Sequence, residues 1–253
     1  MNRKRFYEEH KNFSHRTINE YFLSPGIRCK FDLLKENLNL KNQLKNVIDI
    51  GCSGNSFLYV FNNSFHKSFF DLANLPLKQY SSKIYLYPVC GDILRLPYRN
   101  DSFDFVCALD VLEHIKDDQM AVSEISRILK KNGIVVITVP HKMKYYTFQD
   151  RLIGHYRRYE INQIKGLFKK YKLQALKFFG IYGQLMRVAD IQSTNPKEIE
   201  RKILKLRNRY EANSFFQNIW NIIVKIMANI MKLDAKYLSL NKIMNLAFIF
   251  IKK

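Results

Sequence analysis

Residues 47–58, VIDIGCSGNSFL, constrain the fold of this chain more than any other segment. An apolar β-like run ends around the acid Asp49, and a turn of small residues separates it from a second apolar run. This order predicts a strand, a tight turn and a helix N-terminus, an arrangement that binds nucleotide-like cofactors. Gly51 and Gly54 are expected to supply the positive φ angles of the turn, and Asn55 also tolerates them.

Glycine turns between strands and helices are common, so the interpretation depends on the residues after the turn. Asp71 ends a second β-like run about 20 residues after Gly51, where a Rossmann-type unit places the carboxylate that binds ribose hydroxyls. Asp92 comes after a third β-like run, and further apolar runs lie within 94–115 and 132–140. The alternation predicts an α/β fold with a doubly wound, mostly parallel sheet.

Two more motifs lie beyond the glycine turn, LPYRNDSFD at 96–104 and LEH at 112–114. With all three in this order, the chain from about Val47 to Gly183 resembles class I S-adenosylmethionine (SAM)-dependent methyltransferases of the broad small-molecule and lipid type. The resemblance implies a Rossmann-like methyltransferase fold, SAM as the cofactor and methyl transfer as the activity. The G-x-G-x-x-G spacing of nicotinamide-binding turns is not met, which argues against that cofactor.

In the resembling family the glycine turn binds the methionine part of SAM, and acids after the second and third strands meet the ribose and the adenine. The resemblance therefore implies a set of cofactor-binding residues: Asp49, Gly51, Cys52, Gly54, Asn55, Asp71, Leu72, Asp92, Ile93 and Leu109. The usual turn G-C-G-x-G reads G-C-S-G-N here, so Ser53 and Asn55 replace two glycines. Because serine is small and asparagine tolerates left-handed backbone, we expect SAM binding to survive.

The methyl group of SAM is already activated, so the transfer needs alignment and exclusion of water but no metal. A histidine is the natural base if the acceptor must lose a proton. His114 and His141 both come after apolar runs, at the sheet edge where open α/β proteins bind ligands. His155 lies in GHYRRY at 154–159 and is the third candidate. Each has a structural alternative, and the sequence does not choose among them.

The segment GHYRRY also suggests an acceptor site, because G-H-x-R-R-Y at this place resembles a subset of the family. Arg157, Arg158 and Tyr159 are candidates for binding a phosphate or carboxylate of the acceptor, since arginine forms bidentate contacts with such groups. The alternative is a basic surface loop that starts the next helix. Both interpretations remain open at this point.

Three regions are expected along the chain. Residues 1–46 form an N-terminal helical cap, with a break at Ser24-Pro25-Gly26 and a helix from Phe31 to Leu40. Residues 47–183 form the SAM-binding core, in which Asp117–Lys131 is a helix that Gly133 ends. Residues 184–253 are a helical appendage plus a final strand that, in the resembling family, pairs antiparallel within the sheet.

Residues 214–233 of this appendage predict an amphipathic helix, in which polar side chains form one narrow stripe and apolar side chains cover the rest. A basic run at 197–209 precedes it. Such a helix can pack on the domain as a lid, form a dimer surface or lie in a membrane interface beside anionic lipids. All three interpretations stay open.

The net charge of +20 calls for an anionic partner, either a membrane or RNA, unless the lysines are only a solvated coat. No run of about 18 uncharged apolar residues is present. The four cysteines are scattered and show no C-x-x-C pair, which indicates reduced thiols and a cytoplasmic protein. Peripheral membrane contact through 214–233 is compatible with that location.

These observations favour a SAM-dependent methyltransferase whose acceptor is a small molecule, either anionic or lipid-linked. An RNA methyltransferase is the first alternative, although the chain lacks an N-P-P-[FY]-type tetrapeptide. The altered glycine turn suggests the second, a non-catalytic protein that keeps the SAM-binding fold.

Overall fold

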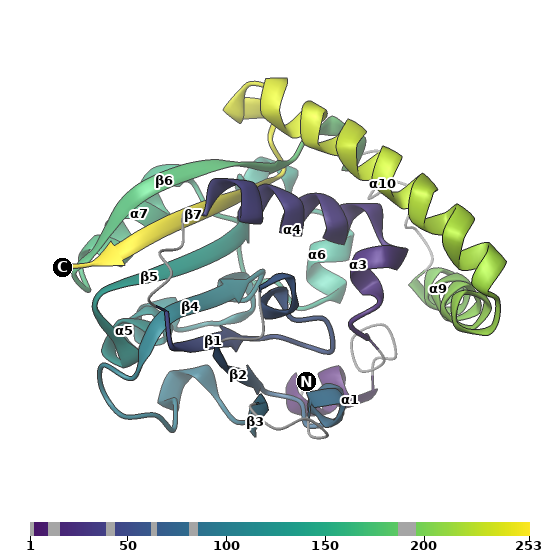
Figure 1. The fold of residues 1–253 in the computed structure, drawn as a ribbon. Coiled ribbons are helices and arrows are strands. Elements are labelled where there is room, and N and C mark those ends of the chain that lie inside the picture. The colour runs from purple at the N-terminus through teal and green to yellow at the C-terminus, as the bar shows by residue number, and fades with distance from the viewer. Residues whose placement is uncertain (1–2, 10–15, 39–43, 62–64, 81–85, 187–195) are drawn as a thin grey trace.

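A mostly parallel sheet of seven strands forms the centre of the molecule (Figure 1). The computed structural model describes residues 3–9, 16–38, 44–61, 65–80, 86–186 and 196–253. The strands are β1 (Asn46–Ile50), β2 (His66–Asp71), β3 (Leu86–Cys90), β4 (Phe103–Leu109), β5 (Leu129–Pro140), β6 (Leu173–Tyr182) and β7 (Asn245–Lys252). They lie in the order β3-β2-β1-β4-β5-β7-β6. The pairs from β3 to β5 are parallel, and β7 runs antiparallel to both β5 and β6. The predicted fold class is confirmed.

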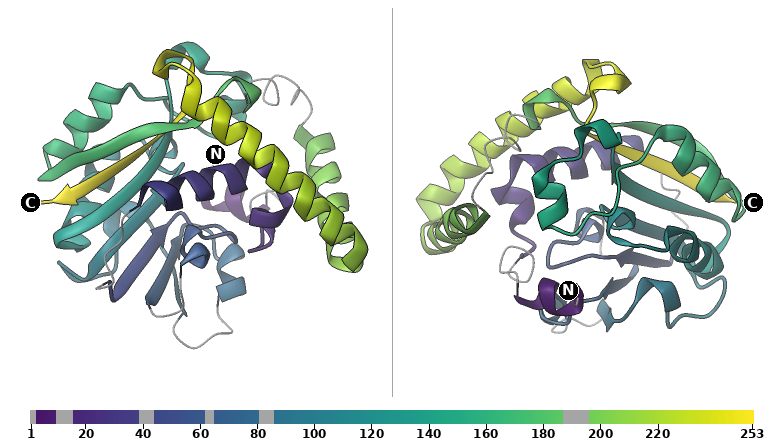
Figure 2. Two further views of the ribbon diagram at one scale, coloured as in Figure 1. Left: turned by 45° about the horizontal axis from the view of Figure 1, so that its top comes forward. Right: turned by 180° about the vertical axis from the view of Figure 1, so that it is seen from behind.

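Helices cover both faces of this sheet (Figures 1 and 2). Their bounds are α1 (Arg3–Glu9), α3 (Glu20–Leu23), α4 (Pro25–Asn37), α5 (Asp118–Ile128), α6 (Phe148–Leu152), α7 (Ile161–Lys169), α9 (Pro196–Ala212) and α10 (Ser214–Tyr237). One face is covered by α4, over which the long α10 runs, and the opposite face by α5 and α7. Within the described residues, no helix is long and apolar enough to cross a bilayer.

The strands are apolar on both sides because successive side chains point to opposite faces of a covered sheet. In β5, Val135 and Ile137 pack in the cluster that contains Ile125 of α5 and Phe168 of α7. Val136, between them, packs in the other cluster, with residues of α4 and α10. Continuous apolar runs therefore predicted these strands correctly.

Three local predictions need correction. No α-helix comes directly after the glycine turn, because Phe57–Val60 form a single 3₁₀ turn that Ser56 caps. Ser24 forms the predicted break, between the end of α3 at Leu23 and the start of α4, but the helix predicted from Phe31 begins earlier, at Pro25. The Ser24 hydroxyl accepts a hydrogen bond from the Ile27 amide at 3.3 Å, and Pro25 stands in the first turn, where its missing N–H costs nothing. This helix ends at Asn37, and the predicted end at Leu40 lies outside the described residues.

The helix predicted for Asp117–Lys131 ends earlier, at Ile128, and Gly133 does not end it. Asp117 caps it as expected, by accepting from the Met120 amide. The chain enters β5 at Leu129, which pairs with β4 across an irregular register. A Cβ atom at Gly133 would lie 2.8 Å from the Leu129 side chain, so this glycine serves close packing inside the strand.

Helices α9 and α10 precede β7, as the predicted insertion before the last strand requires. Helix α10 approaches α4 and β6 through small or slim buried residues, Val224, Ala228 and Ala235. It therefore packs on the domain along one side only. The opposite side carries a row of exposed apolar side chains, among them Ile222 and Ile226.

Candidate active site

The carboxyl ends of β1, β2 and β4 border a cavity of about 1080 Å³. Ligands of open α/β sheets bind at this edge, outside the carboxyl ends of the strands. The other walls come from α1, α3, α4, α6, α9 and α10, so both the N-terminal cap and the appendage help to enclose it. Every residue predicted to bind the cofactor, except Gly54, lines this cavity.

Gly54 is covered by the N-terminal segment instead. A Cβ atom at Gly54 would overlap the backbone carbonyl of Arg16, and the same carbonyl accepts a hydrogen bond from the Gln79 side chain. Glycine at this position therefore lets the segment before α3 cross the turn closely. The Arg16 side chain lines the cavity.

The conformation of the glycine turn differs from the prediction in one respect. Positive φ angles occur at Gly51, at 72°, and at Ser53, at 48°, whereas neither Gly54 nor Asn55 adopts one. Serine thus occupies a left-handed position of the turn, at which the usual G-C-G-x-G turn of the resembling family has glycine. A Cβ atom at Gly51 would lie 2.5 Å from a methyl carbon of Val111, so any side chain there meets the cavity wall.

Two acids, Asp49, which is buried, and Asp71, which is partly exposed, hold the turn in place. Asp49 accepts hydrogen bonds from the Ser56 hydroxyl at 2.5 Å and the Phe57 amide at 3.1 Å, and burial raises its pKa to about 6. Asp71 accepts from the backbone amides of Ser53 and Ala73 at 2.8 and 2.9 Å, and burial raises its pKa as well. Asp71 therefore joins the end of β2 to the turn while its carboxylate borders the cavity.

Asp71→Asn is expected to weaken SAM binding by about 1–3 kcal/mol, the cost of losing a charged hydrogen-bond partner, or about 5- to 150-fold in Kd. Asparagine keeps only one of the two oxygens that accept from the Ser53 and Ala73 amides, so circular dichroism must first establish that the variant is folded. Calorimetric titration with SAM measures the change. Asp101→Asn is the control, since Asp101 is exposed and pairs with Lys252 away from the cavity. An unchanged Kd in Asp71→Asn would refute the ribose assignment.

Lys30 and Asp110 form an ion pair on the cavity wall. Lys30 of α4 lies 2.6 Å from Asp110, which also accepts from Thr138 at 2.7 Å and Asn245 at 2.9 Å. Burial disfavours the charge on Asp110, but the Lys30 ammonium together with the hydrogen bonds from Asn245 and Thr138 outweighs it and lowers the pKa of this carboxyl. Asp110 therefore remains ionised. It directly follows the last residue of β4 and has a positive φ of 55°.

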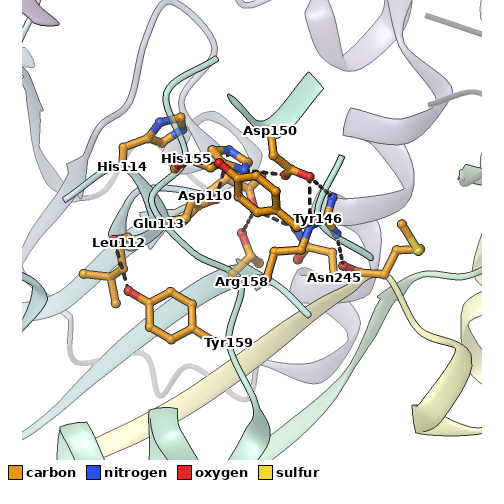
Figure 3. Close-up of polar contacts among 12 residues, drawn as sticks. Asp110, Leu112, Glu113, His114, Tyr146, Asp150, His155, Arg158, Tyr159 and Asn245 are labelled. Atoms are coloured by element: carbon orange, nitrogen blue, oxygen red, sulfur yellow. Dashed lines mark hydrogen bonds and ion pairs between the residues drawn. The ribbon is translucent and has the colours of Figure 1, made fainter. Parts of the chain in front are cut away.

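His114 and His155 lie side by side on the cavity wall, with ring centroids 4.5 Å apart (Figure 3). His114 Nδ1 is 2.9 Å from the Tyr7 hydroxyl of α1. His155 Nδ1 is 2.6 Å from a carboxylate oxygen of Asp150, which orients the ring and directs Nε2 toward Glu113 at 3.9 Å. A histidine oriented by a carboxylate is the usual arrangement of a general base.

Glu113 is buried beside these rings. Burial first, and the charge of Asp110 second, raise its pKa well above the usual range, which favours the protonated carboxyl. Ligand atoms of Glu113, His114 and His155 all lie within 4.8 Å of one another, so this cluster is where the described residues could hold a metal ion. The expectation that no metal takes part stays a prediction.

The GHYRRY segment supports the cavity wall through ion pairs and hydrogen bonds. Of its three predicted acceptor ligands, Arg157 and Tyr159 do not line the cavity. Arg157 pairs with Asp118 at 2.6 Å, and the Tyr159 hydroxyl bonds to the same carboxylate at 3.0 Å. Arg158 does line the cavity, but its Nε and Nη2 atoms bind Asp150 at 3.0 and 2.8 Å. The segment therefore fixes Asp150, which in turn fixes His155.

His141 lies apart from the other two histidine candidates. Its side chain is buried, and Nδ1 lies 3.1 Å from the Ile243 carbonyl. It does not line the cavity. Burial lowers its pKa, which favours the neutral ring of a packed residue. His141 joins β5 to the segment before β7.

Several cavity residues were not predicted as site residues from the sequence: Tyr7, Arg16, Glu20, Lys30, Arg207 and Trp220. All come from the N-terminal cap or the appendage. The basic run at 197–209 included Arg207, but no pattern in the sequence indicated that this side chain turns inward.

The fold is that of a Rossmann-like domain, and the cavity lies at the edge of the sheet where the predicted cofactor residues come together. Residues 48–137 match a family model described as a methyltransferase domain, and the predicted family is confirmed for this part of the chain.

Two sequence relatives match parts of the chain. An uncharacterised protein of Methanocaldococcus jannaschii is 35% identical over 126 residues, 49% of this chain and 53% of that protein. A probable SAM-dependent methyltransferase of Mycolicibacterium smegmatis is 28% identical over 72 residues, 28% of each chain. The chain thus spans about half of the first relative's length and less of the second's.

Solved structures show the same fold. Phosphoethanolamine N-methyltransferase 2 of Haemonchus contortus, in complex with SAM, superposes with a TM-score of 0.64 and 18% identity, covering 100% of this chain and 60% of that one. The YcgJ protein of Bacillus subtilis gives a TM-score of 0.59 and 17% identity, covering 89% and 99%.

Proposed function

We propose that this protein transfers the methyl group of SAM to a small-molecule acceptor, anionic or lipid-linked, bound in the same cavity. The observation that carries the proposal is the shared cavity itself. Cofactor-type residues border it at the ends of β1 and β2, and the oriented His155 faces it from another side. Donor and acceptor can therefore meet within one enclosed space.

The residues present fit the cofactor. Gly51 leaves room at the turn, Asp71 offers a carboxylate for ribose hydroxyls, and Asp92 with Ile93 borders the place expected for adenine. SAM, when bound, supplies a methyl group already activated on sulfur. His155 would accept the acceptor's proton at Nε2, and Asp150 would stabilise the resulting imidazolium. Tyr7 and His114 would hold the acceptor at the cavity wall.

Methyl-labelled SAM incubated with the purified protein and an extract of its own source tests this proposal. The products are separated into organic-soluble, nucleic-acid, protein and small aqueous fractions. Label in the organic or small aqueous fraction supports the proposed acceptor class. Label in RNA would replace it with RNA methylation, and no label beside intact SAM binding would favour a non-catalytic role.

The outer side of α10 supports peripheral membrane contact and a lipid-linked acceptor. Its exposed apolar side chains recur three or four residues apart and so share one face: Phe215, Ile219, Ile222, Ile226, Ile230, Leu233 and Tyr237. The neighbouring α9 carries exposed basic side chains at Arg201, Lys205 and Arg209. An apolar helix face beside basic residues suits the surface of an anionic bilayer.

Ile222→Glu with Ile226→Glu is expected to reduce binding to phosphatidylglycerol-containing vesicles about tenfold or more, because two apolar side chains can no longer enter the interface. Vesicle co-sedimentation measures the change. Met120→Glu is the control, since Met120 is similarly exposed, 47% against 54% for Ile226, but lies on α5. A wild-type protein that fails to sediment with these vesicles contradicts the membrane proposal.

A further inference from the structure

Arg207 of α9 is a buried side chain with two unused donor groups. Its side chain is only 5% exposed, and Nε donates to Glu20 of α3 at 2.6 Å. Its other nitrogens, Nη1 and Nη2, are buried and have no hydrogen-bond partner within the described residues. Buried donors are normally satisfied, so an arginine that borders a cavity in this state indicates a missing ligand.

The charges around Arg207 favour an anion. Arg16 lines the same cavity, and burial lowers the pKa of its guanidinium group. The charge of Glu20 opposes this shift, and the charge of Arg207 adds to it. Two guanidinium groups are therefore close enough to Glu20 to interact with the same carboxylate. Lys30 and Arg158 face the carboxylates of Asp110 and Asp150, whereas the carboxylate of Glu20 faces the guanidinium groups of both Arg207 and Arg16. Arg207, Arg16 and Glu20 therefore bring two positive charges and one negative charge to this part of the cavity wall.

We infer that Arg207, with Arg16 beside it, binds an oxyanion of the methyl acceptor, a phosphate or a carboxylate. The inference rests on the proposed function and names the chemical class of its substrate. The two Nη groups present the planar pair of donors that bidentate contact with such an anion requires. This assigns to α9 the anion contact that the sequence had suggested for Arg157 and Arg158.

Arg207 itself lies on the side of the cavity formed by α9, α3 and Trp220 of α10, whose indole N–H donates to the Leu23 carbonyl, and this side favours the acceptor. Arg16 reaches the cavity from beside the glycine turn, where its backbone covers Gly54. The cofactor residues come instead from the carboxyl ends of β1 to β3. SAM also carries a carboxylate, however, so the experiment must distinguish the two sources.

Arg207→Met removes the donors, and Arg209→Met is the matched control, because Arg209 lies on the same helix but is exposed and stacks on Phe216. Inorganic phosphate and acetate are titrated by calorimetry into protein saturated with S-adenosylhomocysteine and, separately, into protein without it. We expect saturable binding of at least one anion to the wild type, weaker by about tenfold or more in Arg207→Met and unchanged in Arg209→Met.

Three results would overturn the inference: no saturable anion binding to the wild type, equal binding to Arg207→Met, or a loss of S-adenosylhomocysteine affinity in Arg207→Met as large as the loss for the anion. The last would assign Arg207 to the cofactor's own carboxylate. Because Arg207→Met leaves Glu20 buried without this partner, the double variant Arg207→Met with Glu20→Gln repeats the test in a neutral background. Failure of the wild type to bind the cofactor would refute the proposed function, whereas the titration without cofactor still tests the anion site.

Discussion

Gly51→Val is expected to abolish SAM binding, with a loss of at least about 100-fold in affinity. Gly51 has a φ of 72°, which costs a β-branched residue about 1–2 kcal/mol or more. The new side chain would also start 2.5 Å from a methyl carbon of Val111, on the cavity wall. Calorimetric titration with SAM measures the loss, and circular dichroism establishes that the variant is folded.

Two further variants separate the causes of this loss. Gly51→Ala with Val111→Ala removes the overlap but keeps the unfavourable φ, so it should recover part of the affinity. Gly166→Ala is the control for adding a methyl group, because nothing lies within 4 Å of a Cβ atom at Gly166. Normal SAM affinity in Gly51→Val would show that the turn does not border the cofactor.

His155→Asn is expected to lower kcat by about 10²- to 10⁴-fold, the usual contribution of a general base, with little change in SAM affinity. Its Nδ1 is held by Asp150 at 2.6 Å, which leaves Nε2 to take the proton. His114→Asn should have a smaller effect, because it removes the ring bonded to Tyr7 but leaves the pair of Asp150 and His155 intact. Single-turnover transfer of labelled methyl from SAM to the acceptor measures both.

The control for this series is His66→Asn, since His66 is exposed on β2 and does not line the cavity. Equal activity in His155→Asn and the wild type would mean that His155 is not a general base and that alignment of the acceptor with the methyl group is sufficient for the reaction. A loss of activity on treatment with a chelator, restored by metal, would instead point to an ion held by Glu113, His114 and His155.

The sequence predicted the sheet well because its signals are local. Each strand of a sheet covered on both faces is a short apolar run, and β1, β4 and β5 all have this form. The acids that line the cavity come directly after such runs, as Asp71 and Asp92 do. The fold class could therefore be inferred before the structure, and so could the position of most predicted cofactor residues on one cavity, although their role in binding stays a prediction.

The rest of the site depends on contacts between distant segments, which no local pattern encodes. Arg207 meets Glu20 across 187 residues, and Tyr7 meets His114 across 107. The ion pairs of Arg157 with Asp118 and of Arg158 with Asp150 were also not indicated by the sequence, and the acceptor role expected for these arginines stays a prediction. The conformation of Ser53 was likewise hidden, because glycine usually occupies its left-handed position.

Direct titration of the purified protein with SAM tests the central claim most simply. We expect saturable binding of one SAM per chain, competition by S-adenosylhomocysteine and no binding of NADH at the same concentrations. Absence of SAM binding by a folded protein would contradict the cofactor site, and with it the methyltransferase function proposed from it. Tighter binding of NADH than of SAM would assign the glycine turn to a different class of enzyme.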